Sequence, residues 1–112
     1  MTKIYKIFFI NEKVRKKYVQ LKYGNSSDRI LYKQLNNAMD NIRQNPYYGI
    51  RIKEHQIPRI YSRQDLDNIF KYDLPKGWRL IYSLSRNEIE IFAIVVEWFD
   101  HKNYEKRFNY MF

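Results

Sequence analysis

Three segments in the second half of the chain are rich in β-branched and aromatic residues, and only short turn sequences separate them. The segments span residues 69–74, 78–84 and 88–96. Pro75-Lys76-Gly77 and Ser85-Arg86-Asn87 lie between them, and connections of this length join strands that run antiparallel. Because such side chains suit a pleated, half-buried surface, we expect a three-stranded antiparallel meander.

The first part of the chain has a strand pattern followed by helical patterns. Residues 3–10 alternate between apolar and polar side chains enough to form a strand with one apolar face. Asn11 can cap a helix that ends at Gly24. The apolar positions of this helix recur at helical spacing, at Val14, Tyr18 and Leu21. The segment is therefore expected to be a short amphipathic helix with a basic outer face.

A second helix is expected directly afterwards. Ser27 is a suitable N-cap, and Asp28 falls in the first turn, where the helix dipole favours a negative charge. Asn45-Pro46 ends the helix. Its apolar stripe consists of Leu31, Leu35, Ala38 and Ile42. Two consecutive helices joined by Gly24-Asn25-Ser26 predict an antiparallel helical hairpin whose apolar faces cover the sheet.

The remaining segments are short. Ile50 and Ile52 can form a short strand, and Pro58 is expected to interrupt any helix in its neighbourhood. A final helix is expected over residues 100–108, with the aspartate at its start as N-cap. The sequence thus predicts one α+β domain over residues 1–112, with an N-terminal strand, an antiparallel helical hairpin, an antiparallel β-meander and a short C-terminal helix.

The net charge of +9 is unevenly distributed. Residues 1–63 contain 14 basic and 4 acidic side chains, a net of +10, whereas residues 64–112 contain 7 and 8, a net of −1. Such an excess favours a polyanionic partner, because binding neutralises phosphates and releases counterions. A solvated, solubilising surface explains it equally well. The 11 tyrosines, several beside basic residues, suit stacking on unpaired bases, although biased codon usage gives the same composition.

Composition excludes several classes of site. The chain has no cysteine and only two histidines, which excludes disulfides, thiolate metal sites and a histidine-rich zinc site. We therefore expect no metal ion or cofactor. No apolar run approaches the roughly 20 residues that cross a bilayer, and the opening residues alternate too regularly between charged and apolar for a signal peptide. We expect a cytoplasmic protein with no membrane partner.

The predicted hairpin carries the most specific motif. Gly77-Trp78-Arg79-Leu80-Ile81-Tyr82 follows Phe70-Lys71-Tyr72-Asp73-Leu74, and Asp100-His101-Lys102-Asn103-Tyr104 follows the last predicted strand. With the order of elements, these segments resemble the RelE/ParE toxin superfamily, and the motif likeness covers residues 69–108. The resemblance implies a RelE-like fold, metal-independent cleavage of mRNA on the ribosome as a toxin of a toxin-antitoxin pair, and an acidic cognate antitoxin as protein partner.

Arg79 is suited to bind a phosphate from a rigid position. Alternation along a strand places it on the opposite face from Leu80 and Tyr82, beside the hairpin mouth. A guanidinium stays charged, and its planar fork matches two phosphate oxygens. The alternative is an ion pair across the hairpin with Glu88 or Glu90.

Metal-free RNA cleavage needs a base for the 2′-hydroxyl, cations for the phosphate and an acid for the 5′-oxygen. The resemblance assigns Arg79 and Lys71 to the phosphate, and Tyr104 to stacking on a base or orienting the 2′-hydroxyl. Imidazole titrates near neutrality, so His101 is the candidate general acid or base, unless it only begins a helix.

Two acidic residues are possible auxiliaries. Asp73 stands where some relatives carry a lysine and could act as a base, whereas Glu97 either faces the same site or simply ends a strand. The candidate RNA-binding residues are the basic side chains of the first and last predicted helices, Lys13, Arg15, Lys16, Lys17 and Lys102.

Two other functions stay open at this point. A ParE-like inhibitor of DNA gyrase acts by binding alone and does not need Lys71 and His101. An inactive RelE-fold module binds RNA or protein without cleavage, and the aspartate at position 73 favours it.

Overall fold

The computed structural model describes residues 3–109. The elements in chain order are β1 (Lys6–Phe9), α1 (Glu12–Lys22), α2 (Ser26–Gln44), β2 (Ile50–Arg51), the 3-10 turn η1 (Glu54–Gln56), α3 (Arg59–Ser62), β3 (Phe70–Asp73), the 3-10 turn η2 (Pro75–Gly77), β4 (Arg79–Arg86), β5 (Ile91–Phe99) and α4 (His101–Asn109). No helix in this part of the chain is both long enough and apolar enough to cross a bilayer.

The five strands form one mixed sheet in the order β1-β5-β4-β3-β2. β3, β4 and β5 pair antiparallel, and β2 pairs antiparallel with β3, which confirms the predicted meander. β1 pairs parallel with β5, which makes the sheet mixed. The predicted α+β class, with its N-terminal strand, helix pair, meander and short C-terminal helix, is therefore confirmed.

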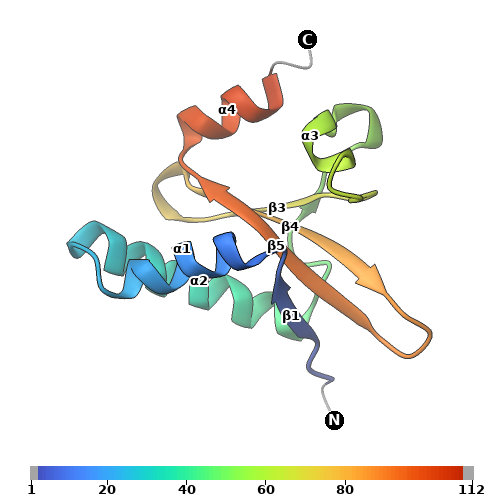
Figure 1. Ribbon diagram of the computed structural model, residues 1–112, viewed down its shortest axis with the longest axis horizontal. Coiled ribbons are helices and arrows are strands. Elements are labelled where there is room, and N and C mark those ends of the chain that lie inside the picture. The colour runs from blue at the N-terminus through green and yellow to red at the C-terminus, as the bar shows by residue number, and fades with distance from the viewer. Residues whose placement is uncertain (1–2, 110–112) are drawn as a thin grey trace.

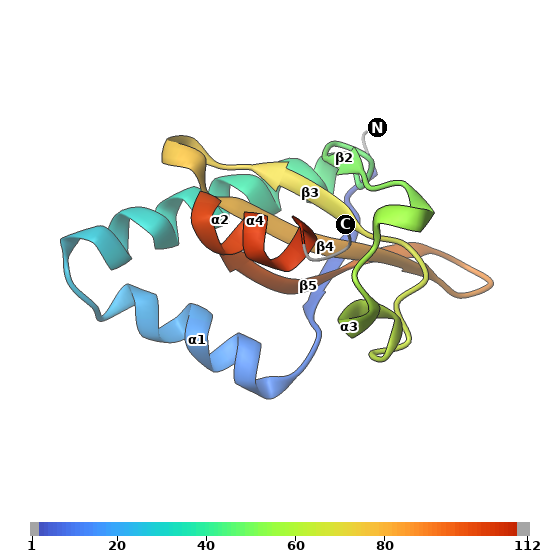
Figure 2. The same cartoon turned by 90° about the horizontal axis from the view of Figure 1, so that it is seen from above.

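Each face of the sheet is covered by different helices (Figure 1). The pair α1 and α2 packs on one face, called here the α2 face, over a core that contains Leu35, Leu80, Tyr82 and Val95. Figure 1 shows α4 and the short α3 on the other side of the strands, and in Figure 2 α4 lies in front of them; we call this side the α4 face. Ile81, Val96 and Phe99 pack there under Phe108. Neighbouring residues of one strand therefore serve two separate cores.

The two long helices begin at asparagine caps. Asn11 Oδ1 accepts a hydrogen bond from the backbone N–H of Val14 at 2.9 Å, as expected. The predicted cap at Ser27 is wrong, because Asn25 caps α2 instead. The Asn25 side chain accepts from the Asp28 N–H, and the Asp28 carboxylate accepts from the Asn25 N–H. This reciprocal pair satisfies two N–H groups that would otherwise lack partners, which a cap at Ser27 would leave open.

β5 lies three residues later than the segment 88–96 predicted for it, and it contains a β-bulge. Tyr82 pairs with Val95 but Ile81 pairs with Glu97, so Val96 has no partner on β4. Val96 packs in the core of the α4 face, and Glu97 contacts side chains of α3 and α4 on the same face. The extra residue therefore turns Glu97 toward the α4 face, a common effect of a bulge.

The segment between α2 and β3 is mostly irregular. The predicted short strand is present at Ile50–Arg51, and Ile52 is buried beside it. Pro58 does not interrupt a helix, because α3 begins at the next residue. A proline with its fixed φ can stand at a helix start, where its missing N–H would have had no helical partner. The expected strand 3–10 is shortened to Lys6–Phe9, and the predicted final helix is confirmed as α4.

Candidate functional site

The start of the meander brings three charged residues of the predicted site together. Asp73 at the end of β3 pairs directly with Arg79 at the start of β4, and Lys71 lies two residues earlier on β3. Because side chains alternate along a strand, all three point to the α4 face, while Phe70 and Leu80 point to the α2 face. Their arrangement follows from the register of a single hairpin.

The Asp73 carboxylate lies between the two cations. Its Oδ1 is 2.7 Å from Arg79 Nε and 3.8 Å from Lys71 Nζ. The Nε–H of Arg79 is not aligned with that oxygen, so the contact is an ion pair without a formed hydrogen bond. The side chains of Arg79 and Lys71 are only 17% and 21% exposed, whereas Asp73 is 50% exposed. The cations are thus held in place, and the carboxylate is the accessible member.

The alternative in which Arg79 pairs with Glu88 or Glu90 is wrong. Glu90 contacts Lys6 instead, with its carboxylate 3.4 Å from the ammonium nitrogen. Among residues 3–109, the hydrogen bond that the Arg79 guanidinium does form runs from Nη1 to the carbonyl oxygen of Trp78, at 3.2 Å. Arg79 therefore faces α4 and not the far end of the hairpin.

Tyr104 on α4 completes this group. Its ring centroid is 5.3 Å from Arg79 Cζ and 5.5 Å from Lys71 Nζ, distances at which a cation is attracted to an aromatic face. Phe99 and Phe108 hold the ring from the core side, with centroids at 5.9 and 4.7 Å. Lys71, Arg79 and Tyr104 thus converge from three elements.

The surroundings keep the Tyr104 hydroxyl protonated. Burial raises its pKa above the usual value, the nearby Arg79 charge partly offsets this, and Asp73 adds a smaller rise. A phenol normally titrates near pH 10, so at neutral pH this hydroxyl is a hydrogen-bond donor.

His101 lies at the border of the site. It begins α4 after the predicted cap, where Asp100 Oδ1 accepts from the Asn103 N–H at 2.9 Å. A side chain on Gly77 would meet the Cβ of His101 at 3.2 Å, so the helix start packs on the β3–β4 turn. The imidazole Nε2, however, lies 2.6 Å from a carboxylate oxygen of Glu105, on an exposed surface. Within residues 3–109, no hydrogen bond or ion pair links it to the cations on the strands.

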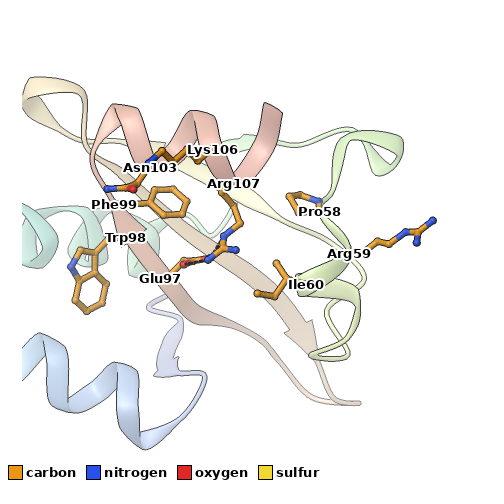
Figure 3. A pocket seen from close by; sticks show the side chains of 9 residues that line it. All are labelled: Pro58, Arg59, Ile60, Glu97, Trp98, Phe99, Asn103, Lys106 and Arg107. Carbon is orange, nitrogen blue, oxygen red and sulfur yellow. Dashed lines mark hydrogen bonds and ion pairs between the residues drawn. The ribbon is translucent and has the colours of Figure 1, made fainter. Parts of the chain in front are cut away.

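Glu97 is not part of the group around Arg79. Its carboxylate accepts the Tyr61 hydroxyl at 2.5 Å. It also lies 3.2 Å from Arg107 Nε, a contact that Figure 3 shows. Burial raises the pKa of the Tyr61 hydroxyl well above its usual value, and the negative charge of Glu97 raises it further. Because Tyr61 belongs to α3 and Arg107 to α4, this network joins both helices to β5.

A cleft of about 810 Å³ opens beside that network. Figure 3 shows it between α3 and α4, with Arg107 directed onto Glu97 and Arg59 directed away. Its lining residues come from three segments, namely Pro58, Arg59, Ile60, Glu97, Trp98, Phe99, Asn103, Lys106 and Arg107. None of the four predicted catalytic residues lines this cleft. The cleft and the predicted catalytic residues therefore lie in different places.

The predicted RNA-binding residues are exposed but do not form one patch. Lys13, Arg15, Lys16 and Lys17 lie on α1, which packs on the α2 face, whereas Lys102 lies on α4. Arg15 is paired with Glu12 one turn earlier. The basic helix and the Arg79 group are thus on opposite sides of the sheet.

Sequence reasoning missed several residues around the site. Tyr61 lies before the segment that resembles the toxins, Arg107 lies inside that segment but outside its quoted motifs, and Tyr48 stands in a segment without periodicity. The Asn45-Pro46 turn was the sequence feature that could have indicated Tyr48, since rigid turns can present exposed side chains. Within the described residues, no group of three His, Cys, Asp or Glu side chains could hold a metal ion.

The arrangement at Arg79 can bind an anion. Two partly buried cations next to an aromatic ring and a phenol suit a phosphate attached to a flat ring system.

Comparisons with protein-family models, with curated proteins and with solved structures gave no match for this chain.

Proposed function

We propose that this protein is a metal-independent endoribonuclease of the RelE type that cleaves mRNA on the ribosome. The observation that supports this most is the convergence of Lys71 and Arg79, with the Tyr104 ring 5.5 and 5.3 Å from their charged groups. Cations for a phosphate beside a ring for a base are what single-stranded RNA requires. The hairpin motif, which resembles RelE/ParE toxins, favours the same activity.

The proposed reaction moves the phosphoryl group to the neighbouring 2′-oxygen. This oxygen attacks phosphorus while Asp73 takes its proton, and the bond from phosphorus to the 5′-oxygen breaks. His101, once its imidazole turns from Glu105 toward the site, protonates the leaving oxygen. The products are a 2′,3′-cyclic phosphate and a 5′-hydroxyl. Lys71 and Arg79 neutralise the charge that develops on the non-bridging oxygens. The protonated Tyr104 hydroxyl orients the 2′-hydroxyl.

One observation favours a second candidate. Asp73 Oδ1 lies 2.7 Å from Arg79 Nε, so a phosphate must compete with this carboxylate. A protein that keeps Asp73 in place would bind RNA or protein weakly at this surface and cleave nothing. This is the inactive RelE-fold module, and a cleavage assay separates it from the nuclease.

The resemblance also suggests a partner and a location. We propose that an acidic antitoxin neutralises the protein, and that both act in the cytoplasm, where ribosomes carry mRNA. Growth arrest on expression, relieved by co-expression of a short acidic protein encoded next to it, is the expected result.

The decisive experiment is cleavage of ribosome-bound mRNA by purified protein, with analysis of the product ends. Arg79→Ala should reduce the rate about 100- to 1000-fold, the usual effect of deleting a group that stabilises transition-state charge. Arg86→Ala is the matched control, because it removes an exposed arginine from the other end of β4. Equal rates for the two variants, or products that end in a 3′-hydroxyl, would contradict the mechanism. No cleavage by the wild type would favour the binding module.

A further inference from the structure

Tyr48 presents an exposed aromatic ring at the edge of the sheet, beside β3, on the side of the α2 face. The ring is stacked on Tyr72, with centroids 5.3 Å apart and planes 19° from parallel. Tyr72 is fixed from behind, because its hydroxyl accepts a hydrogen bond from Asn41 Nδ2 of α2 at 2.7 Å. Tyr48 is 56% exposed, which leaves its outer face free for another flat group.

The turn that carries Tyr48 is rigid. The buried Tyr82 hydroxyl donates to the Pro46 carbonyl at 2.8 Å and accepts from the Gly49 N–H at 2.9 Å. The Tyr48 N–H donates to the Asn45 carbonyl at 3.0 Å. A side chain at Gly49 would meet the Lys71 carbonyl oxygen at 2.6 Å, so the turn packs directly on β3. An exposed ring on such a support loses little conformational entropy when a ligand stacks on it.

This ring and two residues of β3, Lys71 and Asp73, line one surface hollow. A cavity of about 240 Å³ is lined by Tyr48, Gly49, Ile50, Lys71, Tyr72 and Asp73. Lys71 lines this cavity, while its ammonium lies over the Tyr104 ring on the α4 face. The cavity is smaller than the roughly 300–1,000 Å³ of sites for drug-sized ligands, which suits a single planar ring.

We propose that Tyr48 is a stacking platform for one unpaired nucleobase of an RNA strand that passes over the edge of β3, so that a neighbouring phosphate is bound by Lys71. This inference rests on the proposed function and specifies its substrate as unpaired RNA. Only an unpaired base can offer its face to the ring, because in a duplex both faces are covered by neighbouring bases. Stacking is independent of sequence, so the platform positions the strand without selecting a base.

The neighbouring Tyr47 provides a matched control. It is 54% exposed and stands on the same turn, yet it contacts Phe70 edge-on and lines a different hollow, with Asn68 and Arg86. A general loss of aromatic surface or a loosened turn would affect both tyrosines, whereas stacking next to Lys71 involves Tyr48 alone.

The test uses a fluorescent, unpaired 2′-O-methyl oligoribonucleotide, which binds but cannot be cleaved because the attacking hydroxyl is blocked. Binding is followed by anisotropy at fixed salt, with thermal unfolding as the check on folding. Tyr48→Ala should weaken binding about 5- to 150-fold, the range for losing one stacked base. Tyr48→Phe and Tyr47→Ala should stay within about twofold of the wild type, because both keep the stacking ring. A duplex of the same sequence should show no dependence on Tyr48.

An oligonucleotide with abasic sites at every second position gives a second measurement. If Tyr48 stacks on a base, Tyr48→Ala should matter less for the abasic strand than for the intact one. Equal losses for Tyr47→Ala and Tyr48→Ala, or an equal loss on both strands, would overturn the platform and leave the nuclease proposal standing. Binding that depends on Tyr48 without any RNA cleavage would keep the platform and refute the nuclease. A wild type that does not bind the unpaired strand would overturn the platform, whereas the nuclease proposal is decided by the cleavage of ribosome-bound mRNA.

Discussion

Replacement of Tyr82 by phenylalanine tests the support of the site directly. The side chain is fully buried, and its ring stacks on Phe70 at 5.2 Å, a contact that phenylalanine can keep. Only the hydroxyl is lost. The Pro46 carbonyl and the Gly49 N–H each then lose the partner they have at 2.8 and 2.9 Å.

The expected loss of stability follows from those two bonds. A hydrogen bond contributes about 1 kcal/mol net, and a buried polar group without a partner costs about 1–3 kcal/mol. We expect Tyr82→Phe to lower the free energy of unfolding by about 2–4 kcal/mol. With an unfolding entropy of about 2.1 cal/mol/K per residue, this lowers Tm by roughly 9–17 °C for a chain of 112 residues.

The pH dependence gives a second signature. Burial raises the pKa of Tyr82 to about 12, while the bond from Gly49 partly lowers it. In the unfolded chain a tyrosine ionises near pH 10, whereas burial keeps Tyr82 protonated in the folded protein at that pH. Ionisation of the unfolded chain above pH 10 therefore lowers the free energy of unfolding. The stabilising contribution is complete below pH 10 and is lost as pH rises through 12. The difference between wild type and Tyr82→Phe should therefore shrink across that interval.

Urea unfolding followed by circular dichroism at pH 7 and at several values up to pH 11 measures both effects. Tyr47→Phe is the control, because its ring is exposed and within residues 3–109 its hydroxyl has no hydrogen-bond partner. A loss below about 0.5 kcal/mol for Tyr82→Phe at pH 7, the usual range for surface substitutions, would refute the role of the hydroxyl.

Two further substitutions separate the roles of the acidic residues. Asp73→Asn should bind RNA more tightly, by about two- to fivefold, because the ion pair at 2.7 Å from Arg79 no longer competes with phosphate, yet cleave more slowly because the base is lost. Anisotropy and single-turnover cleavage measure the two effects, and weaker binding would contradict the assignment. Glu97→Gln removes the charge that holds Arg107 and should cost about 1–3 kcal/mol in urea unfolding. Unchanged stability would show that this contact does not hold α4 on the sheet.

The fold was predictable where side-chain periodicity is strong. The stripe of Leu31, Leu35, Ala38 and Ile42 is buried, as a helix of the predicted length requires. The strand boundaries depended on local turn chemistry instead. Asn87 Oδ1 accepts from the N–H groups of Ile89 and Glu90, both at 2.8 Å. This Asx-type turn keeps residues 88–90 out of β5 and explains the late start of the strand.

The N-cap of α2 is a second feature that depends on local side-chain chemistry. Both Asn25 and Ser27 have side chains that can accept from a helix N–H, so residue type alone does not separate them. The spacing does, because Asp28 stands three residues after Asn25 and can return a hydrogen bond. The signal was present in the sequence as a relation between two positions.

Within the site, the backbone was predictable and the rotamers were not. Alternation along β3 and β4 was sufficient to bring Lys71, Asp73 and Arg79 to one face. The direction of the His101 ring depends on competition between partners, and Glu105, one helical turn further on, takes it. The position of Glu97 depends on a bulge that composition does not indicate.

Strand β4 links the stability of the fold to the geometry of the site. Arg79 stands at its start and points to the α4 face, and Tyr82, three residues later and on the α2 face, anchors the turn that carries Tyr48. A single strand thus sets both the guanidinium and the stacking ring, from opposite faces. Because β4 has neighbours on both sides over much of its length, neither group can shift without breaking strand pairing. Substitutions that loosen the turn through Tyr82 should therefore weaken RNA binding as well as stability, while leaving the ion pair of Arg79 with Asp73 unchanged.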